Sequence, residues 1–469
     1  MKYTIILLLF VNATFGQEII EKIEKIYYSD SDTLKIRFSD QSEILKVDLS
    51  KRDTISPGTN SGKGLITSAI IGKDTLRIKA DNYPYARKSY VTVVTPKKKT
   101  VVAFRYNAAP SNFSQDYIDA NQGKITIETP EVYELANILL SLSPSANKIA
   151  HLHKNTAYYK AVESYFKPYL NHPIFEKLNF SDNTKALQLY YEFRENSFIY
   201  DFQNNKIVKG ATYNYVYGKD YKSFTNLFTD LLPLVQDFAE KSNFRKFYKK
   251  NKKYYAVDTD RVKQLLPIQN MWTWLEKEFP NRYNAYKVIF SPLITGSHST
   301  QNFVVANPKT KSLFGETIMF ICNADRYDQR TELTEKQKEA LFSGVVFTEI
   351  DHNYVNPISN KYRKEIAEVF NANIWSEKNN HYNNPQSVFN EYMTHAVFNI
   401  WVLENFDVET ANLVIAEKIK MNTEDRGFLN FKAFNDKLIA LRNESPSKTI
   451  IELYPQIIEW SRGQIKSSN

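Results

Sequence analysis

V-V-F-T-E-I-D-H-N-Y-V-N-P, residues 345–357, is the stretch around which the chain is organised. Apolar positions at helical spacing give way to the polar side chains of Glu349, Asp351 and His352, and a proline closes the stretch. Thr348 and His352 are four residues apart, so they share one face of a helix, with Glu349 beside them. The spacing predicts a helix that carries a chemical site at its polar end and stops at the proline.

This arrangement matches the H-E-x-x-H helix of zinc peptidases, with a threonine in place of the first histidine. A zinc hydrolase needs about three protein ligands, an open position for water and a carboxylate that takes the proton of that water. His352 is the natural imidazole ligand and Glu349 the natural general base. The neutral hydroxyl of Thr348 is a poor ligand for Zn²⁺, so the motif predicts weak metal binding unless another group compensates.

A second helix supplies the groups that can compensate. Asn384 followed by Pro385 predicts an N-cap and a first helical position. Glu391 and His395 follow on one face of that helix, four residues apart. Together with His352 they form a possible two-histidine, one-carboxylate metal site.

Three further residues are candidates for the surroundings of this site. Asp351 or Asn353 is predicted to orient a ligand from behind, as hydrogen-bonding side chains commonly do for a metal-bound histidine. His298, in a loop at the end of a strand, is a second possible replacement for the missing imidazole. The E-x-x-H spacing of Glu349 and His352 also occurs in dinuclear carboxylate bundles, but no second E-x-x-H stands in a matching helix.

Length and composition are those of a folded chain of two or three domains. The chain has 469 residues, 42% of them hydrophobic and 24% charged, and its net charge is +9. The basic, aromatic run at residues 245–255 has the composition of a single-stranded nucleic acid platform, but we interpret it as the solvated end of a helix. We therefore predict no nucleic-acid partner.

The first residues indicate export. A lysine at position 2, an apolar run at residues 5–11 and small residues before Gln17 are typical of a secretory signal peptide, which we place at residues 1–16. No later stretch has the uninterrupted apolar length of a transmembrane segment. Cys322 is the only cysteine, so an intrachain disulfide is excluded. We expect a periplasmic or secreted protein.

The pattern changes along the chain in three steps. Residues 17–108 contain short β-branched or alternating runs between turn residues, which predicts an all-β module. Residues 109–129 are polar and are predicted as a linker, with a possible strand at their end. Residues 130–469 show helical periodicity, interrupted by strand-like runs at 286–290, 303–306 and 317–322. The predicted fold class is α+β.

The small sheet precedes the key helix, which we expect to begin after Thr334. This order of strands followed by an active-site helix is the one that a zincin-like domain requires. The sheet would form one wall of a cleft, and its edge strand would hold an extended peptide by strand addition. A peptide or protein is therefore the expected ligand.

The chain resembles a family of exported bacterial proteins described only as a domain of unknown function, whose members look like gluzincin metallopeptidases. The resemblance covers residues from about 130 to the end. It rests on the following stretches: V-Y-E-L-A-N-I (132–138), A-Y-Y (157–159), Y-F-K-P (165–168), H-P (172–173), S-P-L (291–293) and V-N-P (355–357).

The resemblance implies roles for three residues. Glu349 matches the catalytic glutamate, His352 the second histidine ligand, and Glu391 the carboxylate ligand that follows an asparagine on a later helix. It implies a zincin-like, gluzincin-type domain at residues 130–469 and a Zn²⁺ cofactor. Thr348 departs from the family pattern at the first ligand position.

Three functions remain open at this point. The first is an exported metallopeptidase-like protein that hydrolyses peptides with a metal-bound water and the divergent T-E-x-x-H motif. The second is a catalytically inactive pseudo-peptidase that binds a peptide or glycan in the cell envelope. The third is an adhesion or envelope protein in which the polar residues form a buried hydrogen-bond network.

Overall fold

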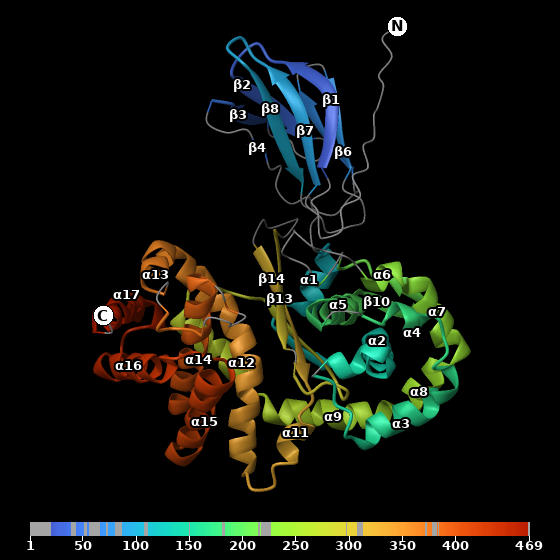
Figure 1. Ribbon diagram of the computed structural model, residues 1–469, viewed down its shortest axis with the longest axis vertical. Helices are drawn as coiled ribbons and strands as arrows, with labels where there is room; N and C mark the ends of the chain where they lie inside the picture. Colours follow the sequence, from blue (N-terminus) through green and yellow to red (C-terminus); the bar gives the residue numbers. More distant parts are fainter. Residues whose placement is uncertain are drawn as a thin grey trace.

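The computed structural model describes residues 20–38, 44–50, 54–55, 66–71, 74–79, 87–106, 111–149, 151–180, 183–213, 216, 227–296, 298–306, 313–370, 373–377, 382 and 384–467. It is an α+β structure, mainly helical, with several small sheets (Figure 1). The predicted signal peptide at residues 1–16 lies outside the described residues.

The N-terminal region consists of two four-stranded sheets, drawn in blue at the top of Figure 1. The order in one is β1-β7-β8-β4 and in the other β3-β2-β5-β6. Alternate side chains of the strands are buried, among them Leu34, Ile36, Val91 and Val93, as expected for sheets with one apolar face. The strands are β1 (Ile20–Tyr28), β2 (Thr33–Phe38), β3 (Ile44–Asp48), β4 (Thr54–Ile55), β5 (Ile66–Ile71), β6 (Asp74–Lys79), β7 (Arg87–Val94) and β8 (Lys99–Tyr106).

A third four-stranded sheet lies at the centre of the remaining chain, with the order β13-β14-β12-β9. Its strands are β9 (Lys124–Glu128), β12 (Ala285–Ser291), β13 (Ser299–Ala306) and β14 (Leu313–Cys322). β12 runs parallel to both β9 and β14, and β13 is antiparallel to β14. β14 is buried from Phe314 onward because helices cover both faces, which explains its nearly continuous apolar sequence.

Helices between residues 115 and 265 lie mainly on one side of this central sheet, the right side in Figure 1. A short hairpin of β10 (Tyr200–Gln203) and β11 (Lys206–Lys209) lies among them. The helices are α1 (Gln115–Asn121), α2 (Glu131–Leu142), α3 (Ala157–Phe166), α4 (Ile174–Lys177), α5 (Asn183–Asn196), α6 (Leu227–Asp230), α7 (Leu232–Lys241), α8 (Phe244–Lys250) and α9 (Lys252–Leu265), with 3-10 turns at Pro144–Lys148, Lys167–Tyr169 and Ser197–Ile199. The next helix, α10 (Ile268–Glu278), packs against α12 (Glu335–Ser359).

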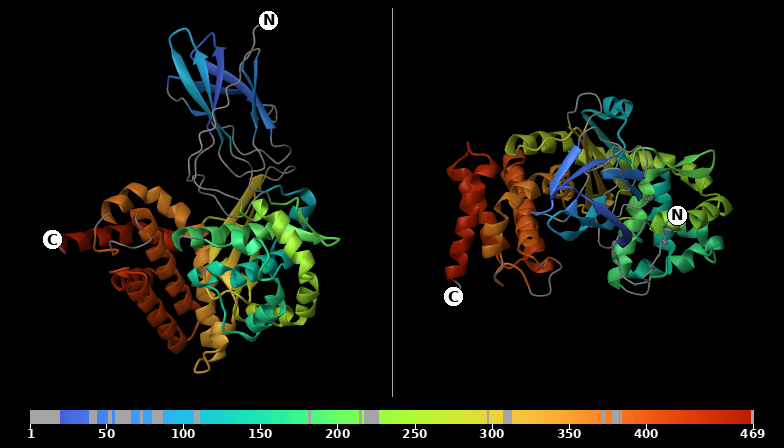
Figure 2. Two further views of the ribbon diagram at one scale, coloured as in Figure 1. Left: turned by 45° about the vertical axis from the view of Figure 1, so that its right-hand side comes forward. Right: turned by 90° about the horizontal axis from the view of Figure 1, so that it is seen from above.

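Helices from the C-terminal part form a separate group on the other side of the sheet, shown in orange and red in Figures 1 and 2. Helix α12 lies between this group and the sheet and is buried on nearly all sides, so its sequence shows little amphipathic pattern. The helices are α11 (Asp325–Asp328), α12 (Glu335–Ser359), α13 (Arg363–Val369), α14 (Pro385–Asn405), α15 (Val408–Lys420), α16 (Phe431–Glu444) and α17 (Ile450–Ser467), with a 3-10 turn at Asn360–Tyr362 and a π-helical turn at Met421–Asp425.

Helix α12 continues past the proline at which the sequence predicts its end. Pro357 lies inside the helix and has no N–H to offer to the carbonyl of Asn353, four residues earlier. Asn281 Nδ2 donates to that carbonyl at 3.2 Å, and the hydroxyl of Tyr283 donates to it at 3.3 Å. These two side chains satisfy the acceptor that the proline leaves open, so the predicted stop at Pro357 is wrong.

The ends of the two key helices follow the sequence signals. Thr334 accepts a hydrogen bond from the N–H of Gln337, whose side chain accepts from the N–H of Thr334, which is a complete capping box. Asn384 caps α14 through the N–H of Ser387, and Pro385 occupies the first turn. Both predicted helix starts are confirmed.

The segment predicted as a linker, residues 109–129, contains α1 and β9. β9 pairs with β12 along its whole length, from Lys124 opposite Ala285 to Glu128 opposite Ile289. This part of the chain therefore belongs to the central sheet. In the part of the chain that the structure describes, no helix is both long enough and apolar enough to cross a bilayer.

Candidate functional site

Helices α12 and α14 pack against each other and bring the polar residues of both predicted motifs together. His352 Nε2 lies 3.3 Å from Glu391 Oε1, and His395 Nε2 lies 3.8 Å from Glu391 Oε2. Glu391 is nearly buried, with a side-chain exposure of 10%. One carboxylate therefore lies between two imidazoles, and the two side chains predicted as metal ligands from different helices share one polar cluster.

The second ring nitrogen of His352 is held by neutral groups. Nδ1 lies 3.4 Å from Asn356 Oδ1 on the same helix and 3.4 Å from Thr394 Oγ1 on α14. Asp351 is a predicted orienting residue, but no hydrogen bond joins its carboxylate to the ring of His352. The side chain of Asp351 is fully buried, and neither carboxylate oxygen has a hydrogen-bond partner among the described residues.

Arg426 is a member of the cluster that the sequence analysis does not include. It follows the π-helical turn at Met421–Asp425, and its guanidinium donates to Glu391 Oε2 at 2.6 Å. About a third of its side chain is exposed. A single cation without a helical pattern around it gives no sequence signal, and only the fold brings Arg426 to Glu391.

Thr348 donates a hydrogen bond to its own helix. Its hydroxyl donates to the carbonyl oxygen of Gly344 at 2.9 Å. Lys418 Nζ on α15 approaches the same oxygen at 3.4 Å and lies 5.0 Å from the ring centre of Phe398. A Cβ at Gly344 would lie 2.9 Å from Lys418 Nζ, so the glycine makes room for this lysine. Lys418 therefore borders position 348, where a zinc peptidase has its first histidine, and is a second basic side chain in this region besides Arg426.

His298 precedes β13 and is half-buried. Its Nε2 has no hydrogen-bond partner among the described residues. Burial, followed by the positive charges of Arg326 and Arg194, lowers its pKa to about 3. Within the described part of the chain, no hydrogen bond or ion pair connects His298 with Thr348 or Glu391.

Burial and neighbouring charges shift the pKa values of the clustered groups. Burial lowers the pKa of His352, but the carboxylate of Glu391 outweighs it and raises this pKa to about 9. Burial raises the pKa of Glu391, and the charges of His352 and Arg426 reverse this and lower it. Glu391 and His352 are therefore a carboxylate and an imidazolium at neutral pH, joined by an ion pair.

Two further groups have pKa values near neutrality. Burial raises the pKa of the Glu349 carboxyl to about 7. Burial also lowers the pKa of Lys418 to about 7, with a further contribution from the charge of Arg426. The pKa of His395 lies well below its usual value, because of burial and the charges of Arg426 and Lys418. Shifted values of this kind concentrate at functional sites.

The arrangement does not fit a zinc ion. Zinc requires neutral imidazoles and a carboxylate with a free lone pair. His352 is protonated by its contact with Glu391, and the second oxygen of Glu391 is taken by Arg426. Among the residues that the structure describes, no group of three histidine, cysteine, aspartate or glutamate side chains is arranged to hold a metal ion.

Comparisons with known proteins do not assign the chain to a family. No family model matches it, and neither a curated protein nor a solved structure does.

Proposed function

We propose that this is an exported zincin-like protein whose cleft binds peptides without hydrolysing them. The observation that carries the proposal is the contact of 2.6 Å between the guanidinium of Arg426 and Glu391. A zincin would require this carboxylate as a ligand. An arginine in contact with it provides a fixed positive charge at the place where a hydrolase would hold its metal.

The charge of the cluster supports an anionic group as the bound part of the ligand. Arg426 and His352 each reach solvent, with side-chain exposures of 33% and 21%, and both carry a positive charge at neutral pH. Glu391 contacts both cations. The carboxylate of a peptide, at its C-terminus or on an acidic side chain, would add charge-assisted hydrogen bonds on their solvent-exposed side.

The sheet supports an extended chain as the remainder of the ligand. β13 is the edge strand of the central sheet, since it pairs with β14 and with no other described strand. Asn302 on β13 makes a hydrogen bond to Asn353 of α12, the residue next to His352. A peptide that adds to this edge would therefore run past the polar end of α12.

The first experiment separates binding from hydrolysis. Labelled peptides that end in a free carboxylate or in an amide are titrated with the full chain, and fluorescence anisotropy is measured. We expect the free carboxylate to bind about tenfold more tightly, the equivalent of one charge-assisted hydrogen bond. In Arg426→Ala this preference should disappear.

A matched control tests whether the loss is specific. Arg330 is also a partly exposed arginine in an ion pair with a glutamate, Glu417, in the C-terminal helical group. Arg330→Ala should keep the preference for the free carboxylate. If the wild-type protein cleaves the peptides, and Glu349→Gln abolishes the cleavage, the binding proposal is wrong.

Metal-assisted hydrolysis is the second candidate function. It is favoured by the convergence of His352 and His395 on Glu391, both within 4 Å. The test is the zinc content after incubation with Zn²⁺ and gel filtration. We expect no stoichiometric zinc in the wild type, and zinc uptake in the double variant Thr348→His/Arg426→Ala, which restores the ligand and removes the competing cation. One tightly held zinc in the wild type, lost in Glu391→Ala, would establish the second candidate instead.

A further inference from the structure

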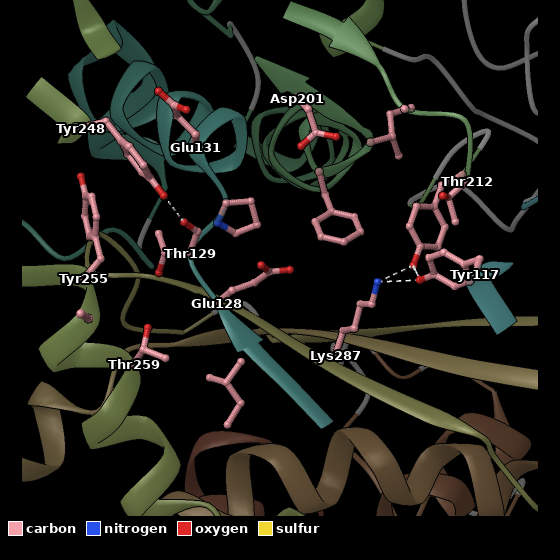
Figure 3. A pocket seen from close by; sticks show the side chains of 17 residues that line it. Tyr117, Glu128, Thr129, Glu131, Asp201, Thr212, Tyr248, Tyr255, Thr259 and Lys287 are labelled. Atoms are coloured by element: carbon pink, nitrogen blue, oxygen red, sulfur yellow. Dashed lines mark hydrogen bonds between the residues drawn. The ribbon is translucent and has the colours of Figure 1, made fainter. Parts of the chain in front are cut away.

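A cavity lies on the opposite side of the central sheet from helix α14. It has a volume of about 570 Å³ and is enclosed by residues of β9, β10, β12, α8 and α9 (Figure 3). This volume is in the range of small-molecule sites, about 300 to 1,000 Å³. None of its lining residues belongs to the cluster around Glu391.

Two carboxylates face this cavity without a partner. Glu128 at the end of β9 and Asp201 on β10 both point into it (Figure 3). No hydrogen bond or ion pair joins either side chain to another described residue. Burial raises the pKa of both groups, the charge of Lys287 lowers both, and the charge of Asp201 raises the pKa of Glu128. Lys287 therefore attracts both carboxylates, and the two carboxylates repel each other.

The other charged residues of the lining are already paired. Glu131 accepts a hydrogen bond from Arg245 Nε at 2.9 Å. Lys287 Nζ donates to the hydroxyl of Tyr117 at 2.6 Å and lies 3.7 Å from the buried carboxylate of Glu316. Glu131 is paired with Arg245, and Lys287 is shared between Glu316, Glu128 and Asp201, so the lining carries more negative than positive charge. This balance favours a cation as the bound molecule.

A buried hydroxyl adds a neutral acceptor to the two carboxylates. Thr129 lies in the wall beside Glu128, is 6% exposed, and its Oγ1 has no hydrogen-bond partner among the described residues (Figure 3). Tyr248 holds the same residue by donating to its carbonyl oxygen at 2.7 Å. Tyr248 and Tyr255 add aromatic faces, which attract ammonium groups. A primary ammonium has three N–H donors, the number of acceptors that Glu128, Asp201 and Thr129 provide.

We infer that this cavity binds a small organic cation with a primary ammonium group, such as an amino sugar or a short diamine. The ammonium lies between Glu128 and Asp201 and donates its third hydrogen bond to Thr129. The side of the cavity near Lys287 carries a positive charge, so it accepts a hydroxyl or apolar body and disfavours a second cation close to it.

Calorimetric titration of the full chain tests the inference with three probes. Glucosamine and putrescine carry ammonium groups, and N-acetylglucosamine has the shape of the first without its charge. We expect saturable binding of at least one amine and none of N-acetylglucosamine. If neither amine saturates at millimolar concentration, or if the acetylated sugar binds as well as glucosamine, the inference is overturned.

Two variants locate the site. Glu128→Gln and Asp201→Asn should each weaken amine binding by about tenfold, because each removes one charge-assisted hydrogen bond. Asp201 is exposed, so Asp201→Asn tests the site even if Glu128→Gln disturbs the fold. Glu163→Gln, on an exposed face of α3 away from the lining, is the matched control and should leave binding unchanged. Unchanged binding in both Glu128→Gln and Asp201→Asn would place the amine elsewhere and refute the assignment.

Discussion

Two arginine–glutamate clusters join distant segments in the C-terminal half, and they differ in how fully their hydrogen bonds are satisfied. Arg442 donates to Glu278 at 2.9 and 3.2 Å and to Glu404 at 2.8 Å, and the N–H of Ile450 also donates to Glu278. Arg442 is 10% exposed and Glu278 1%.

The cluster around Glu391 is incomplete by the same measure. His395 Nδ1 lacks a hydrogen-bond partner among the described residues, and Arg426 and His352 reach solvent. A completed, buried network stabilises a fold, whereas an open one with shifted pKa values keeps bonding capacity for a ligand. The proposed binding role of the Glu391 cluster predicts that the two clusters contribute differently to stability.

The largest expected effect compares the two arginines directly. Arg442→Ala leaves Glu278 buried without its cation and should lower the free energy of unfolding by about 3 to 5 kcal/mol. Arg426→Ala leaves a carboxylate that keeps its contact with His352, and the loss should be about 1 kcal/mol. Urea denaturation measures both. Equal losses in the free energy of unfolding would show that both clusters are structural.

Asp351 extends the comparison to a buried charge that no hydrogen bond satisfies. Burial raises the pKa of Asp351 well above 3.8, so the folded state is destabilised as pH rises above 3.8, where the unfolded carboxyl ionises. Asp351→Asn should therefore raise the free energy of unfolding at pH 7 by about 2 kcal/mol. The gain should vanish below pH 3.8. A loss of stability at pH 7 would reveal a native partner for this carboxylate.

His352 gives a smaller effect with the same direction of pH dependence, at a higher pH. Its pKa is raised from 6.5 to about 9, so its ion pair stabilises the folded state fully below pH 6.5, and this contribution is lost as pH rises through about 9. We expect a contribution of about 1 kcal/mol, reduced by partial exposure. Between pH 6.5 and 9 the unfolding temperature of the wild type should therefore fall more steeply than that of His352→Gln. Parallel curves would contradict the ion pair with Glu391.

The smallest effect concerns the outer end of the completed network. Glu404 is 35% exposed and shares Arg442 with the buried Glu278. Glu404→Gln should cost at most about 0.5 kcal/mol, because solvent screens the exposed pair and the glutamine still accepts from Arg442. Urea denaturation of Glu404→Gln and Arg442→Ala under the same conditions measures the two losses in the free energy of unfolding. A cost above that of Arg426→Ala would mean that exposure does not distinguish the clusters.

Local signals in the sequence account for much of the fold. The starts of α12 and α14 follow from Thr334 and from the Asn384-Pro385 pair, because a cap depends on a few neighbouring residues. The strand patterns at residues 286–290 and 317–322 lie within β12 and β14 for the same reason. The convergence of His352 and Glu391 follows the spacing of the two motifs.

What the sequence could not predict depends on contacts between distant segments. The extension of α12 through Pro357 requires Asn281 and Tyr283, which a local pattern does not connect to the helix. Arg426 reaches Glu391 only through the packing of the π-helical turn against α14. The aromatic residues of the basic run at 245–255 are partly core and partly cavity wall, and Tyr248 and Tyr255 gain that place from β9, far away in the chain.

The ladder between β9 and β12 sets a condition on when the chain can fold. Lys124 lies opposite Ala285, and in the described sheet β12 is the strand with which β9 pairs. Native pairing of this kind closes a long loop and is slow to form. In a nascent chain in which β12 has not yet been synthesised, β9 is an unpaired edge strand, which is a site of aggregation. Chains truncated before β12 should therefore accumulate as insoluble intermediates, whereas those extending through α17 should not.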